Sequence, residues 1–182
     1  MNTLSALMHL GEVWHPLRRF ELAADLVAAG LEADLQDQPA KISSLEHGAW
    51  VVGTASAGLL NAVRSNDIGR CAEAAVGLAV AGLRVAAELP DPYRVNMDQS
   101  YRCARENTWA ELMRATQLHK RQWASVHEGF GVVFEEVVEF GEDAARGWVE
   151  HARVEVIQVS AMGVRFLADL VDVNQMVAAS AA

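Results

Sequence analysis

The sequence predicts an all-α protein, and three observations carry that prediction. Alanine, leucine, valine and glutamate dominate the 182 residues, of which 52% are hydrophobic and 21% are charged. Only four prolines and thirteen glycines interrupt the chain. Strand-like alternation flanked by Asn-Gly or Asp-Gly turns is absent. Good helix formers in this abundance favour helices throughout, and the length suits one compact domain or two small fused bundles with an ample core.

Helices are expected in six segments of the chain. Their predicted ranges are 18–35, 45–63, 69–88, 98–122, 127–145 and 149–170. The strongest break is the Leu-Pro-Asp-Pro-Tyr run at 89–93, where two prolines stop a helix and stiffen a linker. Ser125 and Glu128 have the spacing of a capping box, which predicts the start of the fifth helix. Gly147 predicts the break before the sixth.

An internal similarity relates two of these helical pairs. Residues 48–89 align with residues 129–170 at a constant offset of 81, without a gap. Identity is low and Ala-rich helices match easily by chance, so duplication and chance similarity both stay open. Under duplication the first copy keeps the packing pattern and lacks the acids and the amide that are the candidate metal ligands of the second copy. The positions of Glu135, Glu136, Glu139, Glu155 and Gln158 are held there by Thr54, Ala55, Gly58, Ala74 and Gly77.

The chain therefore divides into five predicted parts. They are an N-terminal helical segment (1–40), a degenerate helical repeat without metal ligands (41–90), a linker (91–96), a unit of metal-binding helices (97–172) and a tail (173–182). The small-residue helices at 48–63 and 69–88 predict close helix–helix packing, within the chain or across a dimer. We expect a homo-oligomer, with a two-copy monomer as the alternative.

The most informative side chains are acids on the last two predicted helices. Glu136 and Glu139 are three residues apart, as are Glu155 and Gln158, so each pair shares one helix face. Glu135 lies four residues before Glu139 and borders that face. Carboxylate and amide oxygens make a hard oxygen site suited to Mg²⁺ or Mn²⁺, and two helices that bring carboxylates to a shared interior are how helical bundles build such sites.

The surroundings of these acids leave another interpretation open. A Glu-rich helix is usually a solvated face, and Glu128, Glu142 and Asp143 continue the acidity beyond the cluster. Glu155 and Gln158, by contrast, sit in an otherwise apolar run, where an isolated charge is costly unless it is paired or bound to metal. The last helix carries a polar stripe that is either an interhelical network or the wall of a site: His151, Glu155, Gln158, Arg165 and Asp169.

Residues 125–170 resemble the MazG-like all-α NTP pyrophosphohydrolases, the superfamily that includes the dimeric dUTPases. The family pattern is Glu-Glu-x-x-Glu, a spacer, and then Glu-x-x-Asp on the next helix. Here the first motif is Glu135-Glu136-x-x-Glu139 and the second is Glu155-x-x-Gln158, so an amide stands where the wider family has Asp. The surrounding residues look especially like short MazG-like proteins of phages and their hosts.

The resemblance implies a four-helix-bundle MazG-like fold, a tandem of two related helical pairs in this chain, and Mg²⁺ held by the motif acids. Glu136, Glu139 and Glu155 would be metal ligands, Glu135 a ligand or a water-orienting base, and Gln158 a weaker ligand through its oxygen. Glu135 and Glu139 are the residues expected to be catalytic. Arg165 and Lys120 are the candidates for holding the phosphate tail of the nucleotide.

The composition argues against some classes of binding partner and against a membrane location. The net charge is −9 and no Lys/Arg run exceeds two residues, which argues against a nucleic-acid partner. The most apolar stretch, 48–63, is too short and too rich in small residues for a membrane span. Cys71 and Cys103 lack metal-ligand spacing, which favours free thiols in a reducing cytoplasm.

The function expected is Mg²⁺-dependent hydrolysis of a nucleoside triphosphate to a monophosphate and pyrophosphate. The alternative is a catalytically silent MazG-like helical protein that binds a nucleotide or a protein partner, or serves in assembly. A plain helical bundle with an acidic surface is a third possibility.

Overall fold

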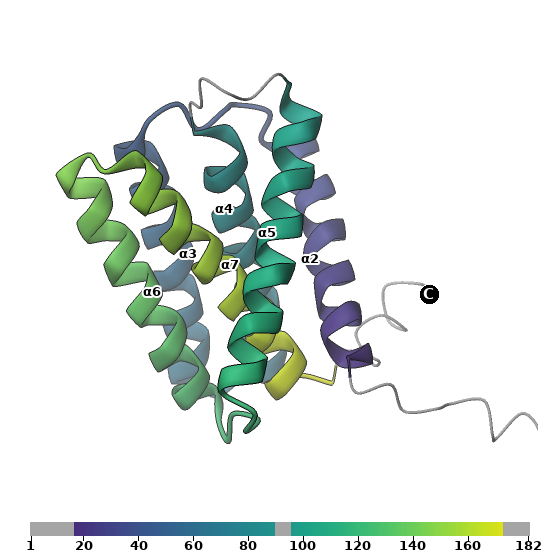
Figure 1. Cartoon of the computed structure of the whole chain (residues 1–182). Coiled ribbons are helices and arrows are strands. Elements are labelled where there is room, and N and C mark those ends of the chain that lie inside the picture. The colour runs from purple at the N-terminus through teal and green to yellow at the C-terminus, as the bar shows by residue number, and fades with distance from the viewer. Residues whose placement is uncertain (1–16, 90–95, 173–182) are drawn as a thin grey trace, which may run out of the picture.

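The computed structural model describes residues 17–89 and 96–172. Within them lie six α-helices and no strand: α2 (Arg18–Asp37), α3 (Leu45–Ser65), α4 (Ile68–Glu88), α5 (Met97–Leu118), α6 (Val126–Arg146) and α7 (Val149–Leu170). Helices α4 and α7 form a central layer, with α3 and α6 on one side and α2 and α5 on the other (Figure 1). The all-α prediction is confirmed. Most of the predicted linker, the tail at 173–182 and the first sixteen residues lie outside the described residues.

The predicted helix boundaries are confirmed to within a few residues. The Ser125 hydroxyl accepts a hydrogen bond from the N–H of Glu128, and the Glu128 carboxylate accepts one of 2.7 Å from the N–H of Ala124. Gly147 ends α6 in the left-handed region with φ 73°. The one clear difference is α5, which ends at Leu118 and not at residue 122. The chain leaves the helix there because the carbonyls that follow accept hydrogen bonds from α7.

The two central helices pack closely where small residues meet. They run antiparallel, and the Ser160 hydroxyl on α7 donates a 2.9 Å hydrogen bond to the carbonyl of Ala79 on α4. A Cβ added at Gly82 would lie 2.9 Å from the Val156 carbonyl oxygen, and one added at Gly163 would lie 2.9 Å from the Ala79 Cβ. Both are closer than a side-chain carbon tolerates, so the close packing expected of the small-residue helix at 69–88 occurs within the chain, against α7.

The two halves of the chain are alike beyond the aligned residues. Helices α3 and α6 begin and end 81 residues apart, and so do their caps: Ser44 and Ser125 each accept an N-terminal hydrogen bond, while Asn66 and Gly147 each end their helix with a positive φ. Helices α2 and α5, which the alignment did not include, bury residues at the same offset. Each half is therefore a unit of three helices.

A buried ion pair at the end of each central helix repeats at this offset. Arg84 donates to the carboxylate of Glu88 and, over 2.6 Å, to the Ala40 carbonyl. Arg165 likewise donates to Asp169 and, over 3.0 Å, to the Arg121 carbonyl. In both halves the acid also accepts a backbone N–H from the segment before the next helix, that of Ile42 or of Trp123. These pairs fix the connection α2–α3 and the connection α5–α6 to the core.

No helix among the described residues has the length and apolar character needed to cross a membrane.

Candidate metal centre

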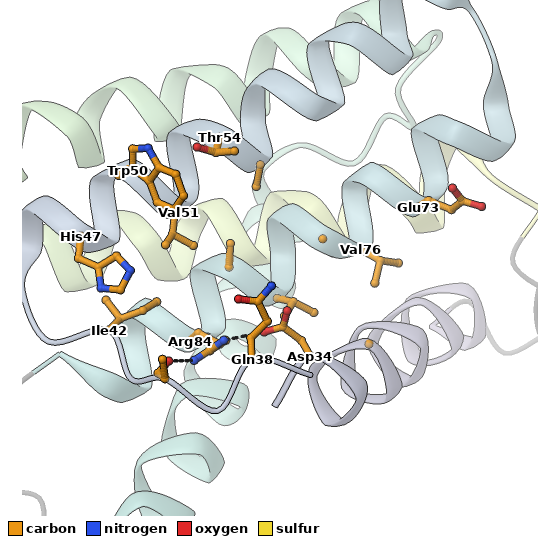
Figure 2. A pocket seen from close by; sticks show the side chains of 16 residues that line it. Asp34, Gln38, Ile42, His47, Trp50, Val51, Thr54, Glu73, Val76 and Arg84 are labelled. Carbon is orange, nitrogen blue, oxygen red and sulfur yellow. Dashed lines mark hydrogen bonds and ion pairs between the residues drawn. The ribbon is translucent and has the colours of Figure 1, made fainter. Parts of the chain in front are cut away.

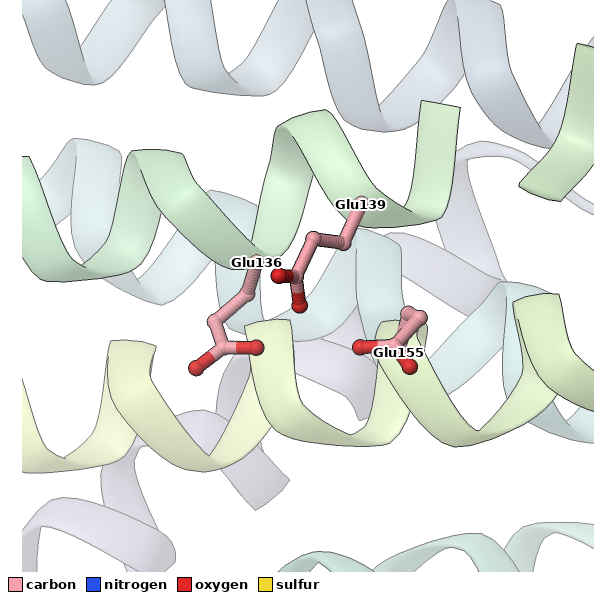
Figure 3. Close-up of side chains that lie close together, drawn as sticks. All are labelled: Glu136, Glu139 and Glu155. Carbon is pink, nitrogen blue, oxygen red and sulfur yellow. The ribbon is translucent and has the colours of Figure 1, made fainter. Parts of the chain in front are cut away.

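Three glutamates on neighbouring helices meet at one point of the α6–α7 interface. Glu136 and Glu139 extend from α6 toward α7, and Glu155 faces them from α7 (Figure 3). One carboxylate oxygen of each lies within 4.8 Å of an oxygen of the other two. We call these three residues the carboxylate triad. The spacing argument that put Glu136 with Glu139 on one face, and expected Glu155 opposite, agrees with this geometry.

The surroundings of the triad disfavour the charged form of its carboxyl groups. Burial, followed by the charges of Glu139 and Glu155, raises the pKa of Glu136 from 4.5 to about 7. The pKa of Glu155 is also raised, first by burial and then by Glu139 and Asp143. Among the described residues, no lysine or arginine forms an ion pair with any of the three. Crowded carboxylates without a cationic partner repel one another, and a divalent cation or a bound proton removes that repulsion.

Gln158 joins the triad through a hydrogen bond. Its Nε2 donates to Oε2 of Glu155 over 2.6 Å, one turn earlier on α7. The amide thus lies beside the triad, at the place where the spacing predicted it, and relieves part of the negative charge on Glu155. An amide oxygen is a weaker ligand for Mg²⁺ than a carboxylate.

Glu135 lies outside the triad and lines an adjoining cavity. This cavity, of about 570 Å³, lies between α5, α6, α7 and the α5–α6 connection, and we call it the triad cavity because Glu136 is part of its wall. Glu135 is exposed there. Four cations line the same cavity: Arg114, Lys120, Arg121 and Arg165. The structure thus brings the carboxylate triad next to a cavity whose wall carries both acids and cations.

Arg165 reaches the triad cavity but is already engaged. It is only 3% exposed, its guanidinium donates to the carbonyls of His119 and Arg121, and it stacks 4.8 Å from the centre of the Trp123 ring. These contacts give it a structural role in holding the α5–α6 connection. Its assignment to a phosphate stays a prediction, as does that of Lys120, whose side chain is exposed.

Three further residues near the triad were not predicted from the sequence. Asp143, on the same face of α6 four residues after Glu139, contributes to the raised pKa of Glu155 and pairs with Arg146 over 3.3 Å. That spacing was visible in the sequence, but the acid was named only among those that continue the acidity beyond the cluster. Glu111 and Arg114 form an ion pair of 2.6 Å on α5 beside the triad cavity. Only the packing of α5 against the bundle brings them there.

Comparison of the chain with family models, with curated proteins and with solved structures gives no match. Any functional assignment therefore rests on the residues of the chain and their geometry.

Proposed function

We propose that the protein is a MazG-like, Mg²⁺-dependent hydrolase that splits a nucleoside triphosphate into a monophosphate and pyrophosphate. The observation that carries the proposal is the carboxylate triad, three oxygens from two helices within 4.8 Å of one another and without an ion pair to the described lysines and arginines. The set fits Mg²⁺, which prefers carboxylate oxygens and keeps part of its water shell. Mn²⁺ suits the same ligands.

The positions of the four glutamates suggest two different roles, metal binding and water orientation. Glu136, Glu139 and Glu155 would hold the metal, which when bound neutralises phosphate charge and lowers the pKa of a bound water. Glu135 lies outside the triad and faces the cavity, which favours the water-orienting role over that of a ligand. Water adds to a phosphorus of the α–β anhydride, the bridging P–O bond breaks, and Glu135 takes the proton of the water.

The triad cavity suits a polyphosphate chain. Arg114, Lys120 and Arg121 line it, and the exposed guanidinium groups of the first and last are paired with half-buried acids, Glu111 and Glu128. Water reaches the arginine side of each pair and screens it, so a phosphate can compete with the acid. Guanidinium groups favour phosphate because their donors match its oxygens.

The matched halves favour a tandem architecture for this proposal. Caps, buried ion pairs and close contacts recur at the offset of 81 residues, which favours duplication over chance similarity. The first half has Ala55, Gly58 and Ala74 at the positions of the triad, so it would complete the bundle without holding a metal.

One observation favours the alternative, a catalytically silent protein that binds a nucleotide. The hydrogen bond from Gln158 stabilises Glu155 without a metal, and the amide leaves four carboxylates where the family pattern has five. Under this alternative the protein binds a triphosphate and releases no pyrophosphate.

Pyrophosphate release from a panel of NTPs and dNTPs with Mg²⁺ or Mn²⁺ tests the proposal. Glu139→Gln removes a triad ligand, and Glu142→Gln is the matched control, since Glu142 lies on the same helix and pairs with Arg146 at the surface. We expect release from the wild type and from Glu142→Gln, and a loss of at least about 100-fold in Glu139→Gln, the scale at which loss of a metal-centred electrostatic contribution is felt. No release from any nucleotide by folded protein would reject the enzyme in favour of the silent binder.

A further inference from the structure

The first half contains a cavity that corresponds to the triad cavity. It has a volume of about 500 Å³ and is lined by α2, the α2–α3 connection, α3 and α4 (Figure 2). We call it the first-half cavity. Its walls follow the offset of 81 residues: Ile42 takes the place of Trp123, Val51 that of Val132, and Arg84 that of Arg165. The two halves therefore keep the same cavity, and its chemistry is what differs.

The first-half cavity lacks the acidic cluster and the exposed cations of its counterpart, and it has an acid of its own in Glu73, where the second half has Val154. Gly30, Thr54 and Ala55 stand in place of the acids Glu111, Glu135 and Glu136, and Ala33, Pro39 and Ala40 stand in place of the cations Arg114, Lys120 and Arg121. The arginine that remains, Arg84, is neutralised by Asp34 over 2.8 Å and by Glu88 over 2.8 Å. A polyphosphate chain would meet an arginine that is already paired and the acids Asp34 and Glu73 on this wall.

The aromatic and hydrogen-bonding groups of the first-half cavity differ from those of its counterpart. Trp50 stands where the second half has Gly131, His47 where it has Glu128, and Gln38 where it has His119. Trp50 is 68% exposed, and His47 lies beside it on α3 with its ring 6.4 Å away (Figure 2). A large exposed indole at a cavity wall offers a flat apolar face for a ring to stack on. The amide of Gln38 offers both a donor and an acceptor to the edge of such a ring.

We infer that the first-half cavity is a second, metal-independent ligand site for an uncharged, flat heteroaromatic ligand of the nucleoside class. The volume is within the range of small-molecule sites. The arginine of the wall is already paired with acids and Glu73 adds a negative charge, so the wall disfavours a ligand with phosphates. The choice of a nucleoside over other flat rings rests on the proposed function, because the corresponding cavity of the second half would take a nucleotide. The site itself needs neither the triad nor a metal.

The test is isothermal titration calorimetry with adenosine, guanosine, cytidine and uridine, with the full chain in EDTA. We expect at least one nucleoside to bind. Trp50→Ala should weaken its binding about tenfold or more, since stacking of a base on an aromatic side chain contributes about 1–3 kcal/mol. Trp148→Ala is the matched control, because Trp148 is also exposed, at 51%, but lies outside the cavity. It should bind as the wild type does.

Glu139→Gln separates this inference from the proposed function. It removes a triad ligand, so nucleoside binding in EDTA should be unchanged even though pyrophosphate release is lost. Absence of binding by all four nucleosides at millimolar concentration would overturn the inference. So would binding that Trp50→Ala leaves intact, or binding that Glu139→Gln abolishes, because the ligand would then lie elsewhere. None of these outcomes decides the result of the pyrophosphate-release assay, which tests the proposed function separately.

Discussion

The Nε2 of Gln158 donates a 2.6 Å hydrogen bond to Oε2 of Glu155, and this contact joins a neutral amide to the carboxylate triad. Compared with an Asp at this position, the amide lowers the total negative charge of the cluster. Glu155 therefore has one carboxylate neighbour fewer. Under the proposed function, the amide lowers the affinity for Mg²⁺ and raises the stability of the metal-free protein.

Gln158→Asp should lower the stability of the metal-free protein and raise its affinity for Mg²⁺. Without metal the variant should be less stable than the wild type by about 0.5 kcal/mol, because like charges one turn apart on a helix repel. With Mg²⁺ it should gain more stability than the wild type does, because a fourth carboxylate strengthens a hard oxygen site. Thermal unfolding in EDTA and in a Mg²⁺ series measures both effects. A variant with the same metal response as the wild type would place residue 158 outside the metal centre.

Stability without metal should fall as the pH rises. Glu136 has a pKa of about 7 in the folded protein and 4.5 as its ordinary value, so between these values the folded state holds a proton that the unfolded state has released. Its contribution is complete below pH 4.5 and is lost as the pH rises through 7. We expect the free energy of unfolding in EDTA to fall by about 1–2 kcal/mol between pH 5 and 8, allowing for solvent screening.

Urea unfolding of the wild type and of Glu136→Gln measures this loss. The amide carries no charge at either pH, so the variant should lose much less stability over the same range. Equal pH dependence in the two proteins would show that Glu136 titrates normally, and the triad would then lack the repulsion that a cation relieves.

Two glycines on α4 should respond in opposite directions to alanine. Gly82→Ala places a Cβ 2.9 Å from the Val156 carbonyl oxygen and closer still to the Ser160 hydroxyl, so we expect a loss of about 1–3 kcal/mol from overpacking. Gly77→Ala on the same helix meets no atom within 4 Å and should stabilise by about 0.5–1 kcal/mol through helix propensity. Chemical denaturation measures both. Equal effects would contradict the close crossing of α4 and α7.

Arg165 and Lys120 should behave differently although both line the triad cavity. Arg165→Met leaves Asp169 buried with one partner fewer and releases the carbonyls of His119 and Arg121, so it should cost about 3–5 kcal/mol of stability. Lys120→Ala should change stability by less than about 0.5 kcal/mol, as exposed positions usually do, and raise KM for a triphosphate. An Arg165 variant of normal stability with a raised KM would instead assign that residue to the phosphates.

The sequence predicted local features better than those that depend on packing. Ser125 and Gly147 marked helix ends because capping and positive φ are local demands, and the spacing of Glu136 and Glu139 is enough to place them on one face. Residues 119–122 were assigned to α5 because His-Lys-Arg-Gln is compatible with a helix. In the fold, the hydrogen bonds of Arg165 to the carbonyls of that segment override its propensity.

The internal repeat and the candidate site show the same contrast between local features and features that depend on packing. The alignment found α3 with α6 and α4 with α7, where buried small residues keep the similarity detectable. It did not extend to α2 and α5, which share only scattered buried positions such as Ala23 with Ala104. Glu111 and Arg114 could not be assigned to the site from the sequence, because no periodicity along α5 says which helix it packs beside.

The central claim is that the carboxylate triad holds a divalent cation, and Mn²⁺ binding followed by electron paramagnetic resonance tests it most directly. We predict one Mn²⁺ bound per chain in the wild type, competition by Mg²⁺, and loss of binding in Glu155→Ala. Glu150→Ala is the control, since it removes a charge from the first turn of the same helix, away from the triad. No saturable binding by the wild type, or binding that Glu155→Ala leaves intact together with unchanged or increased stability, would contradict the account and identify the acids as a solvated face of a plain helical bundle.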